Sequence, residues 1–190
     1  MQIGLFFGSF NPVHIGHLII AEYMIHAAKA DQVWFVVSPQ NPFKKDDILL
    51  PENQRLEMVK IATADNDRLQ VCDIEFELPK PSFTFDTLTV LLEKYPEHTF
   101  SLIMGSDNLV YFEQWKSYEE ILKKVTLHVY RRYDQYHEEL EKNLNIKVHE
   151  APVLHISATY VREQILQKNS IKYLVTDKVL EYMVLNKIVS

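Results

Sequence analysis

The sequence predicts an α/β fold, doubly wound around a mostly parallel sheet, with a small C-terminal helical part. Short apolar runs of strand length alternate with segments whose apolar residues recur at helical spacing. The run 33–37 is wholly apolar, as in a strand buried on both faces of a parallel sheet, and the runs 3–7 and 99–104 are mainly apolar. The 190 residues contain no internal repeat, so we expect one domain over 1–190.

The first three elements are a strand, a helix and a strand. The apolar run 3–7 ends at a Gly-Ser turn, where a strand would stop. A helix over about 16–28 follows, because apolar residues recur there three and four positions apart. The run 33–37 then has the length of a buried strand, which completes one strand-helix-strand unit.

Four further elements precede the middle of the chain. Pro51 suits the first position of a helix extending to about residue 64. The segment 69–74 is predicted as a short strand. A helix capped by Ser82 or Thr84 is expected to end at Tyr95, and the run 99–104 then forms a strand that stops at a Gly-Ser-Asp turn.

The last third of the chain continues the alternation. A helix is expected over 118–124 and a strand over 125–130. The segment 133–143 is highly charged, which predicts a surface helix. A helix carrying 161–166 and a last helix over 176–185 form the C-terminal helical part.

Composition excludes several classes of protein. The formal net charge of −6 argues against a nucleic-acid binder, which would carry a basic surface. No apolar run approaches the ~20 residues that a membrane-spanning helix needs. The single cysteine, Cys72, cannot form an internal disulfide. We therefore expect a cytoplasmic protein with no nucleic-acid or membrane partner, and the sequence leaves open whether it forms a homo-oligomer.

The turn after the first strand carries the densest chemistry. His14 and His17 are three residues apart where a helix begins, with Gly8 before them and Gly16 between them. A helix start has unpaired N–H groups and a partial positive charge, so these imidazoles would stand beside an anion site. Neither cysteine nor carboxylate lies in the motif, which disfavours a protein-built metal site. Phosphate is the expected ligand.

Further donors follow the ends of other predicted strands, where loops of such sheets converge. They are Lys44, Arg132, Ser157 and Arg162. Neither a Gly-x-x-x-x-Gly-Lys-Ser/Thr nor a Gly-x-Ser-x-Gly sequence occurs, which disfavours P-loop and covalent chemistry. The pattern predicts a polyphosphate clamp that transfers a group by positioning it.

Several motifs carry a resemblance. Residues 8–17, Gly-Ser-Phe-Asn-Pro-Val-His-Ile-Gly-His, are similar to the Gly-Ser/Thr-Phe-Asp-Pro-x-His-x-Gly-His signature of the nucleotidyltransferase superfamily. Phe7 stands where most members have a first glycine, and Asn11 where most have aspartate. Later segments resemble, in order, the motifs of bacterial nicotinate-nucleotide adenylyltransferases: 39–44, 82–87, 105–107, 114–115, 131–132 and 156–162.

The resemblance implies a Rossmann-like nucleotidyltransferase fold and adenylyl transfer from ATP to nicotinate mononucleotide, a step of NAD synthesis. Transfer would be direct, and Mg²⁺ would be bound mainly through the ATP phosphates. The implied catalytic residues are His14, His17, Lys44 and Arg162. Those implied to bind ATP are Gly8, Ser9, Phe10, His14, His17, Gly105, Asp107, Arg132, Ile156, Ser157 and Arg162. Those implied to bind the nicotinate nucleotide are Ser9, Lys44, Thr84 and Trp115.

Two alternatives stay open at this point. The chain could be another nucleotidyltransferase of the superfamily, acting on nicotinamide mononucleotide, on pantetheine phosphate or with a cytidine nucleotide. It could also be a non-catalytic module that senses nucleotides, although a clamp on the leaving group is not needed for binding alone. Arg55 and Asp86 are expected to serve helix ends and surface pairs rather than substrate.

Overall fold

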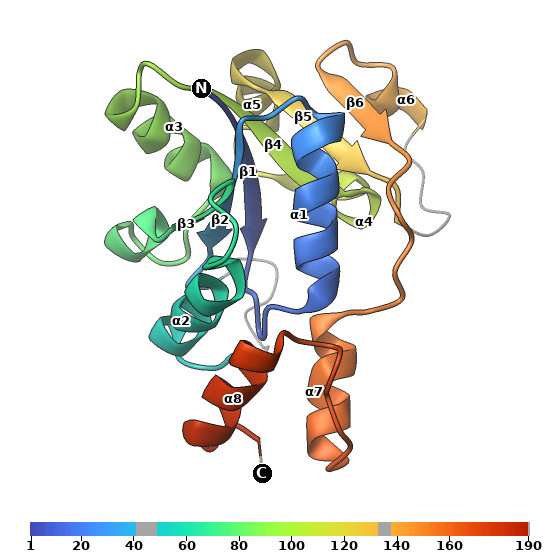
Figure 1. The fold of residues 1–190 in the computed structure, drawn as a ribbon. Helices are drawn as coiled ribbons and strands as arrows, with labels where there is room; N and C mark the ends of the chain where they lie inside the picture. The colour runs from blue at the N-terminus through green and yellow to red at the C-terminus, as the bar shows by residue number, and fades with distance from the viewer. Residues whose placement is uncertain (41–48, 133–137, 190) are drawn as a thin grey trace.

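The computed structural model describes residues 1–40, 49–132 and 138–189, and in this part of the chain six strands form one parallel sheet (Figure 1). Their order is β3-β2-β1-β4-β5-β6, and each neighbouring pair is parallel. The strands are β1 (Gln2–Gly8), β2 (Gln32–Val37), β3 (Leu69–Cys72), β4 (Thr99–Gly105), β5 (Thr126–Tyr130) and β6 (Ile146–His149).

Helices connect the strands. They are α1 (Ile15–Ala27), α2 (Glu52–Thr63), α3 (Thr84–Lys94), α4 (Ser106–Leu109), α5 (Tyr118–Lys124), α6 (Glu138–Glu141), α7 (Ala158–Leu166) and α8 (Asp177–Leu185), with 3₁₀ turns η1 (Ile74–Glu77) and η2 (Phe112–Gln114). This alternation confirms the predicted doubly wound α/β fold, with the C-terminal helices α7 and α8 lying beyond the sheet (Figure 1).

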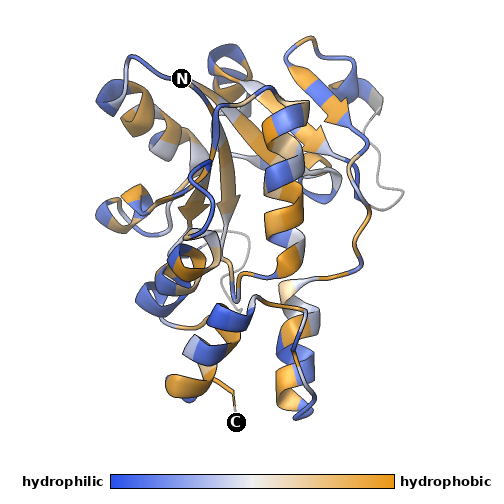
Figure 2. Ribbon diagram, viewed as in Figure 1, coloured by the Kyte–Doolittle hydropathy of each residue, from blue (hydrophilic) through white to orange (hydrophobic). Residues whose placement is uncertain are grey.

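The sheet separates two hydrophobic clusters because successive side chains of a strand point to opposite faces. In β1, Phe6 joins the cluster under α1 and α2, whereas Leu5 joins the cluster under α3 and α5. Both side chains are buried. Figure 2 shows the central strands as mainly hydrophobic and the helices as mixed, as expected for helices with one face on a core.

The strand order reverses between β1 and β4. The chain winds outward from β1 to β3 and then returns to place β4 on the other side of β1. Open α/β sheets bind ligands outside the carboxyl ends of their strands at such a point. The C-terminal segment closes on this region, since the Ile15 N–H donates to the Leu174 carbonyl over 2.8 Å.

The structure corrects some element boundaries. Of the expected helix 133–143, only Glu138–Glu141 is described as α6, and 133–137 lie outside the described residues. Strand β6 was not predicted, because its four residues alternate too briefly to show a period. Thr84 is the first residue of α3, not its cap, and the capping position is Phe83. Within the described ranges, no helix combines the length and apolar character required to cross a membrane.

Candidate functional site

A cavity of about 810 Å³ opens at the carboxyl ends of β1, β4 and β5. Its lining includes every candidate that the sequence singles out within the described ranges, whereas Lys44 lies outside them. These lining residues are Gly8, Ser9, Phe10, His14, His17, Thr84, Gly105, Asp107, Trp115, Arg132, Ile156, Ser157 and Arg162. The converging loops predicted from the sequence thus form one site.

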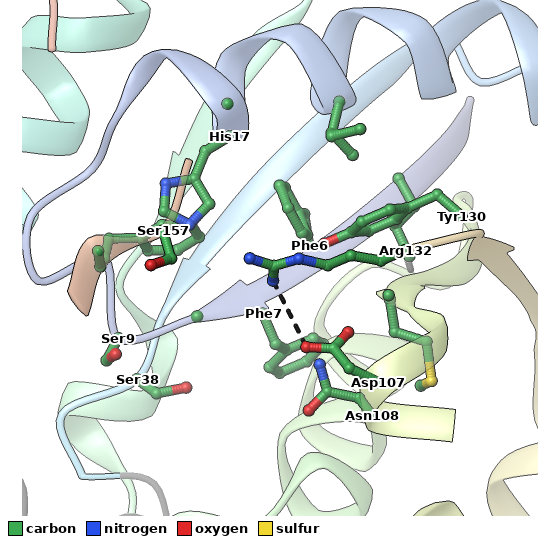
Figure 3. A pocket seen from close by; sticks show the side chains of 18 of the residues that line it. Phe6, Phe7, Ser9, His17, Ser38, Asp107, Asn108, Tyr130, Arg132 and Ser157 are labelled. Carbon is green, nitrogen blue, oxygen red and sulfur yellow. Dashed lines mark hydrogen bonds and ion pairs between the residues drawn. The ribbon is translucent and has the colours of Figure 1, made fainter. Parts of the chain in front are cut away.

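The cavity has two sides, because α1 and α3 cover opposite faces of the sheet. We call the part lined by His14, His17, Ser157 and Arg162 the histidine side, and the part lined by Ser82, Thr84 and Trp115 the tryptophan side. Figure 3 shows the Arg132 guanidinium pointing across the cavity toward His17 and Ser157.

The two histidines hold each other at the start of α1. The backbone N–H of His14 donates to Nδ1 of His17 over 3.1 Å, and the backbone N–H of His17 donates to the His14 carbonyl over 2.9 Å. Their rings stack with centroids 3.6 Å apart. Since Nδ1 of His17 accepts a hydrogen bond, its neutral ring carries the proton on Nε2, which is the donor nitrogen of this ring.

His14 is an uncharged donor. Its side chain is 5% exposed, and burial, reinforced by the charge of Arg132, lowers its pKa from 6.5 to about 4. Its Nδ1 has no hydrogen-bond partner. A proton on Nε2 would therefore leave Nδ1 as an unpaired acceptor, which costs less than an unpaired buried N–H. With this lowered pKa, His14 contributes to the site as a neutral imidazole near pH 7.

Gly8 makes room for an aromatic ring. A Cβ at Gly8 would lie 2.9 Å from the Phe10 ring. Phe10 has a φ of 44°, a left-handed conformation that is rare for a bulky side chain. Its buried ring lies edge-on to His17, with centroids 5.1 Å apart. The absence of a side chain at Gly8 thus makes room for Phe10, which packs against His17, and Gly8 itself lines the cavity.

Arg162 is hydrogen-bonded directly to residues 8–17, which we call the histidine loop. Its Nη1 donates to the Asn11 carbonyl over 2.9 Å, and its Nη2 donates to Oγ1 of Thr159 over 3.2 Å. Ser157 caps α7 by accepting from the Tyr160 N–H over 3.1 Å. The Asn11 side chain, buried at 1% exposure, accepts from the backbone N–H of Leu50 over 3.1 Å. The uncommon asparagine thus has a defined structural contact.

Arg55 is not a surface residue, which corrects the expectation. It is 1% exposed and belongs to α2. Its guanidinium donates to four backbone carbonyls, which belong to Ser9, Ser38, Pro39 and Leu50, over 2.6 to 2.9 Å. A buried arginine satisfied in this way ties the ends of β1 and β2 to the entry of α2. It thereby holds Ser9 and Ser38, two residues that line the cavity.

Asp107 and Arg132 form an ion pair beside the cavity, with Nη1 and Oδ2 3.4 Å apart (Figure 3). The Ser106 hydroxyl also donates to the backbone carbonyl of Arg132 and accepts from the backbone N–H of Arg132, over 2.9 Å in each case. A Cβ at Gly105 would collide with Oδ1 of Asp107, so a larger residue at this position would require the carboxylate to move. That buried oxygen has no hydrogen-bond partner and remains an available acceptor.

The tryptophan side presents an aromatic ring to the cavity. The half-buried Trp115 ring packs on Phe112, with centroids 5.4 Å apart. Lys116 also lines the cavity, but its Nζ is 2.7 Å from Oδ2 of Asp86, and its side chain is 47% exposed. The expected surface role of Asp86 is confirmed. As the first residue of α3, Thr84 has a backbone N–H without an intrahelical acceptor.

Sequence reasoning missed the buried polar floor of the tryptophan side. Glu75 and Ser38 both line the cavity and are almost fully buried. Glu75 stands in a segment that the sequence indicated as irregular chain, and it belongs to η1. Its only signal in the sequence is a carboxylate within a partly apolar segment, too weak to separate it from its exposed neighbour Glu77.

The donor set fits phosphate better than a protein-bound metal. Among the residues that the structure describes, no three His, Cys, Asp or Glu side chains gather as metal ligands would. The two cavity carboxylates, Glu75 and Asp107, are engaged with hydroxyls and with Arg132 respectively. Imidazole and guanidinium N–H groups are instead suited to anionic oxygens. A Mg²⁺ ion would accordingly be held mainly by the phosphates of a bound nucleotide.

Relatives of this chain carry consistent names. A family model described as cytidylyltransferase-like matches residues 5–164. A "Probable nicotinate-nucleotide adenylyltransferase" of Cytophaga hutchinsonii is 51% identical over 98% of this chain and 97% of its own length. A relative of the same name from Bacteroides thetaiotaomicron is 40% identical over 96% of this chain and 91% of its own.

Solved structures support the same fold. The Plasmodium falciparum nicotinic acid mononucleotide adenylyltransferase complexed with NaAD superposes with a TM-score of 0.83 at 20% identity, over 98% of this chain and 96% of that one. Its complex with APC gives 0.81 at 19% identity over the same shares. At such identities the likeness speaks for the fold alone. From its sequence relatives, the chain belongs to the cytidylyltransferase-like family and, within it, to the nicotinate-nucleotide adenylyltransferases.

Proposed function

We propose that this protein transfers the adenylyl group of ATP to nicotinate mononucleotide, forming nicotinate adenine dinucleotide and pyrophosphate. The observation that carries the proposal is one cavity with N–H donors on its histidine side and an aromatic wall on its tryptophan side, in a chain 51% identical to a relative of that name. The donors suit a triphosphate and the aromatic wall suits a pyridine ring.

The chemistry requires positioning rather than a covalent intermediate. An oxygen of the acceptor phosphate attacks the α-phosphorus of ATP, and the bond from that phosphorus to the bridging oxygen of pyrophosphate breaks. A phosphate monoester is largely ionised near neutral pH, so it needs no general base. In-line alignment and stabilisation of the negative charge on the departing pyrophosphate supply the rate acceleration.

Each side chain has a proposed part in this step. His17 donates from Nε2 to the α-phosphate, and His14 donates to the neighbouring phosphates. Arg162 and Ser157 hold the departing pyrophosphate. These roles are supported by the bonds that fix His17 to His14 and Arg162 to the histidine loop.

The remaining candidates are assigned to the two nucleosides. The adenosine of ATP is proposed to contact residues 105–107 and Arg132. The phosphates of ATP are proposed to lie near Gly8, Ser9, Phe10 and Ile156. Thr84 and Trp115 are proposed to frame the pyridine ring, with Ser9 and Lys44 near the acceptor phosphate. Mg²⁺ would neutralise phosphate charge during transfer. We propose that one domain, 1–190, carries the whole site and acts in the cytoplasm.

Release of pyrophosphate tests the proposal. The protein is incubated with ATP and Mg²⁺ and, one at a time, nicotinate mononucleotide, nicotinamide mononucleotide and phosphopantetheine, and CTP replaces ATP in a parallel set. Release should depend on ATP and be fastest with nicotinate mononucleotide. A faster rate with another acceptor or with CTP would assign the chain to a different transferase. Binding of ATP without release in any mixture would indicate a sensing module.

A further inference from the structure

The tryptophan side of the cavity includes a buried carboxylate, that of Glu75. Glu75 lies on η1 and is 2% exposed. Its Oε2 accepts from the Ser82 hydroxyl over 2.6 Å, and its Oε1 accepts from the Thr87 hydroxyl over 2.8 Å. Ser82 and Thr87 lie on either side of Thr84 in the sequence. Both oxygens of one carboxylate therefore hold the segment that begins α3.

This carboxylate is stabilised by hydroxyl groups rather than by a cation. Burial raises the pKa of Glu75, while hydrogen bonds from Ser82, Thr87 and, to a smaller extent, Ser38 lower it. No ion pair of Glu75 occurs among the residues described. A buried carboxylate without a cationic partner is costly, and apolar side chains would fill such a position more cheaply. Its position under the cavity suggests a task there.

Ser38, whose hydroxyl contributes to lowering the pKa of Glu75, is bonded to the end of β1. Its backbone N–H donates to the Gly8 carbonyl over 2.9 Å, and its carbonyl accepts from Arg55 over 2.8 Å. Glu75 thus holds the first turn of α3 by two hydrogen bonds and lines the cavity together with Ser38, which is bonded to the end of β1. A displacement of Glu75 would shift the tryptophan side relative to the histidine side.

We propose that Glu75 is a positioning residue for the acceptor nucleotide: by holding Ser82 and Thr87, it sets the first turn of α3 so that Thr84 and its unpaired backbone N–H meet the pyridine carboxylate. This inference rests on the proposed function. Glutamine at position 75 has the same shape but only one accepting oxygen, so it can satisfy only one of the two hydroxyl donors in the same way.

The test compares Glu75→Gln with Glu77→Gln, a matched control on the exposed face of the same 3₁₀ turn. Steady-state kinetics are measured by pyrophosphate release, varying ATP and nicotinate mononucleotide separately. We expect KM for nicotinate mononucleotide to rise about tenfold in Glu75→Gln, with KM for ATP and kcat within about twofold of wild type. Glu77→Gln should match wild type in all three.

A purely structural role would give a different pattern. Partial unfolding lowers the active fraction and hence kcat, without raising KM for one substrate alone. Unchanged KM for nicotinate mononucleotide in folded Glu75→Gln, or equal rises for both substrates, would overturn the inference while leaving the proposed function intact. A wild-type protein without acceptor-dependent turnover would remove both together.

Ser82→Ala keeps the test decisive if Glu75→Gln fails to fold. This variant removes one hydroxyl donor and leaves the carboxylate, so KM for nicotinate mononucleotide should rise by about threefold and KM for ATP should not. The same KM values as wild type in Ser82→Ala would count against the inference. Where both variants fold, their combination should raise KM less than the product of the two single effects, because both remove the same contact.

Discussion

On the histidine side of the cavity, the two histidines are held by backbone groups of their own helical turn, whereas on the tryptophan side the first turn of α3 is held by a carboxylate from a preceding element. His14 and His17 bond each other within one helical turn, and Arg162 binds the Asn11 carbonyl. The first turn of α3 is instead fixed by Glu75, seven and twelve residues away from its two partners.

This difference has a physical origin. Phosphate groups are recognised by N–H donors, which a helix start and its flanking loop can supply from a few consecutive residues. A flat ring with one carboxylate needs an aromatic wall and a precisely placed turn, and those come from separate segments. The histidine side is therefore expected to govern the rate, and the tryptophan side to govern the choice of acceptor. Four predictions test this division, from the largest effect to the smallest.

Removing the imidazole of His17 should have the largest effect on rate. We expect His17→Ala to lower kcat by on the order of 10²–10³, because a donor directed at the reacting phosphate acts mainly in the transition state. Binding of ATP should weaken by less than about tenfold. His26→Ala, on the exposed face of the same helix, is the matched control. An unchanged kcat with a raised KM for ATP would contradict this role.

Acid should destabilise the histidine side. The pKa of His14 is about 4 in the folded protein and 6.5 as an unperturbed group. Below pH 6.5 the unfolded chain gains this proton first, so stability present above pH 6.5 is lost as pH falls toward 4, by about 3 kcal/mol from this one group.

The measurement is the free energy of unfolding in urea at several pH values between 7 and 4. The pKa of His128 is also lowered to about 4 by burial, so this residue lowers the stability of the protein over the same pH range. The difference between wild type and His14→Gln therefore isolates the contribution of His14. The free energy of unfolding of His14→Gln should vary less with pH than that of wild type. Parallel curves for the two proteins would show that His14 does not titrate this way.

The choice of acceptor should favour the acid over the amide. No Lys or Arg occurs in 82–87, so backbone N–H groups at the start of α3 are the donors for the pyridine carboxylate. An amide would direct its own NH₂ at such donors, and each unsatisfied buried donor costs ~1–3 kcal/mol. We predict kcat/KM about a hundredfold higher for nicotinate mononucleotide than for nicotinamide mononucleotide. Comparable values would refute this model of the tryptophan side.

The smallest effect is expected at Lys116. This lysine lines the cavity, yet its charge is paired with Asp86 and its side chain is about half exposed. Exposed pairs contribute little, so Lys116→Met should change KM for nicotinate mononucleotide by less than about threefold. A rise of tenfold or more would move the recognition of the acceptor from backbone amides to a side-chain cation.

The sequence was sufficient for the parts of the molecule encoded locally. A continuous apolar run predicted β2, and mainly apolar runs that end in small polar turns predicted β1 and β4, because strands buried on both faces need no regular polar alternation. The pair His14 and His17 was recognisable for the same reason: its contacts span three residues. Strand β6 was missed, since four residues give no reliable period.

The buried charges could not be predicted in the same way. Arginine is rarely fully buried, so a surface role for Arg55 was the reasonable expectation, and only the fold brings its four carbonyl acceptors together. Glu75 resembles its exposed neighbour Glu77 in sequence. Their difference depends on which face of a 3₁₀ turn meets the cavity, and this is a property of the tertiary structure.

The contacts of Arg55 also couple two parts of the chain. Its guanidinium binds the carbonyls of Pro39 and Leu50, which precede and follow the segment 41–48. One side chain thereby fixes the end of β2 and the approach to α2 at the same time. Removing it would leave buried carbonyls without a donor on both sides of the segment, at ~1–3 kcal/mol each. A single substitution at position 55 would therefore loosen both attachments together.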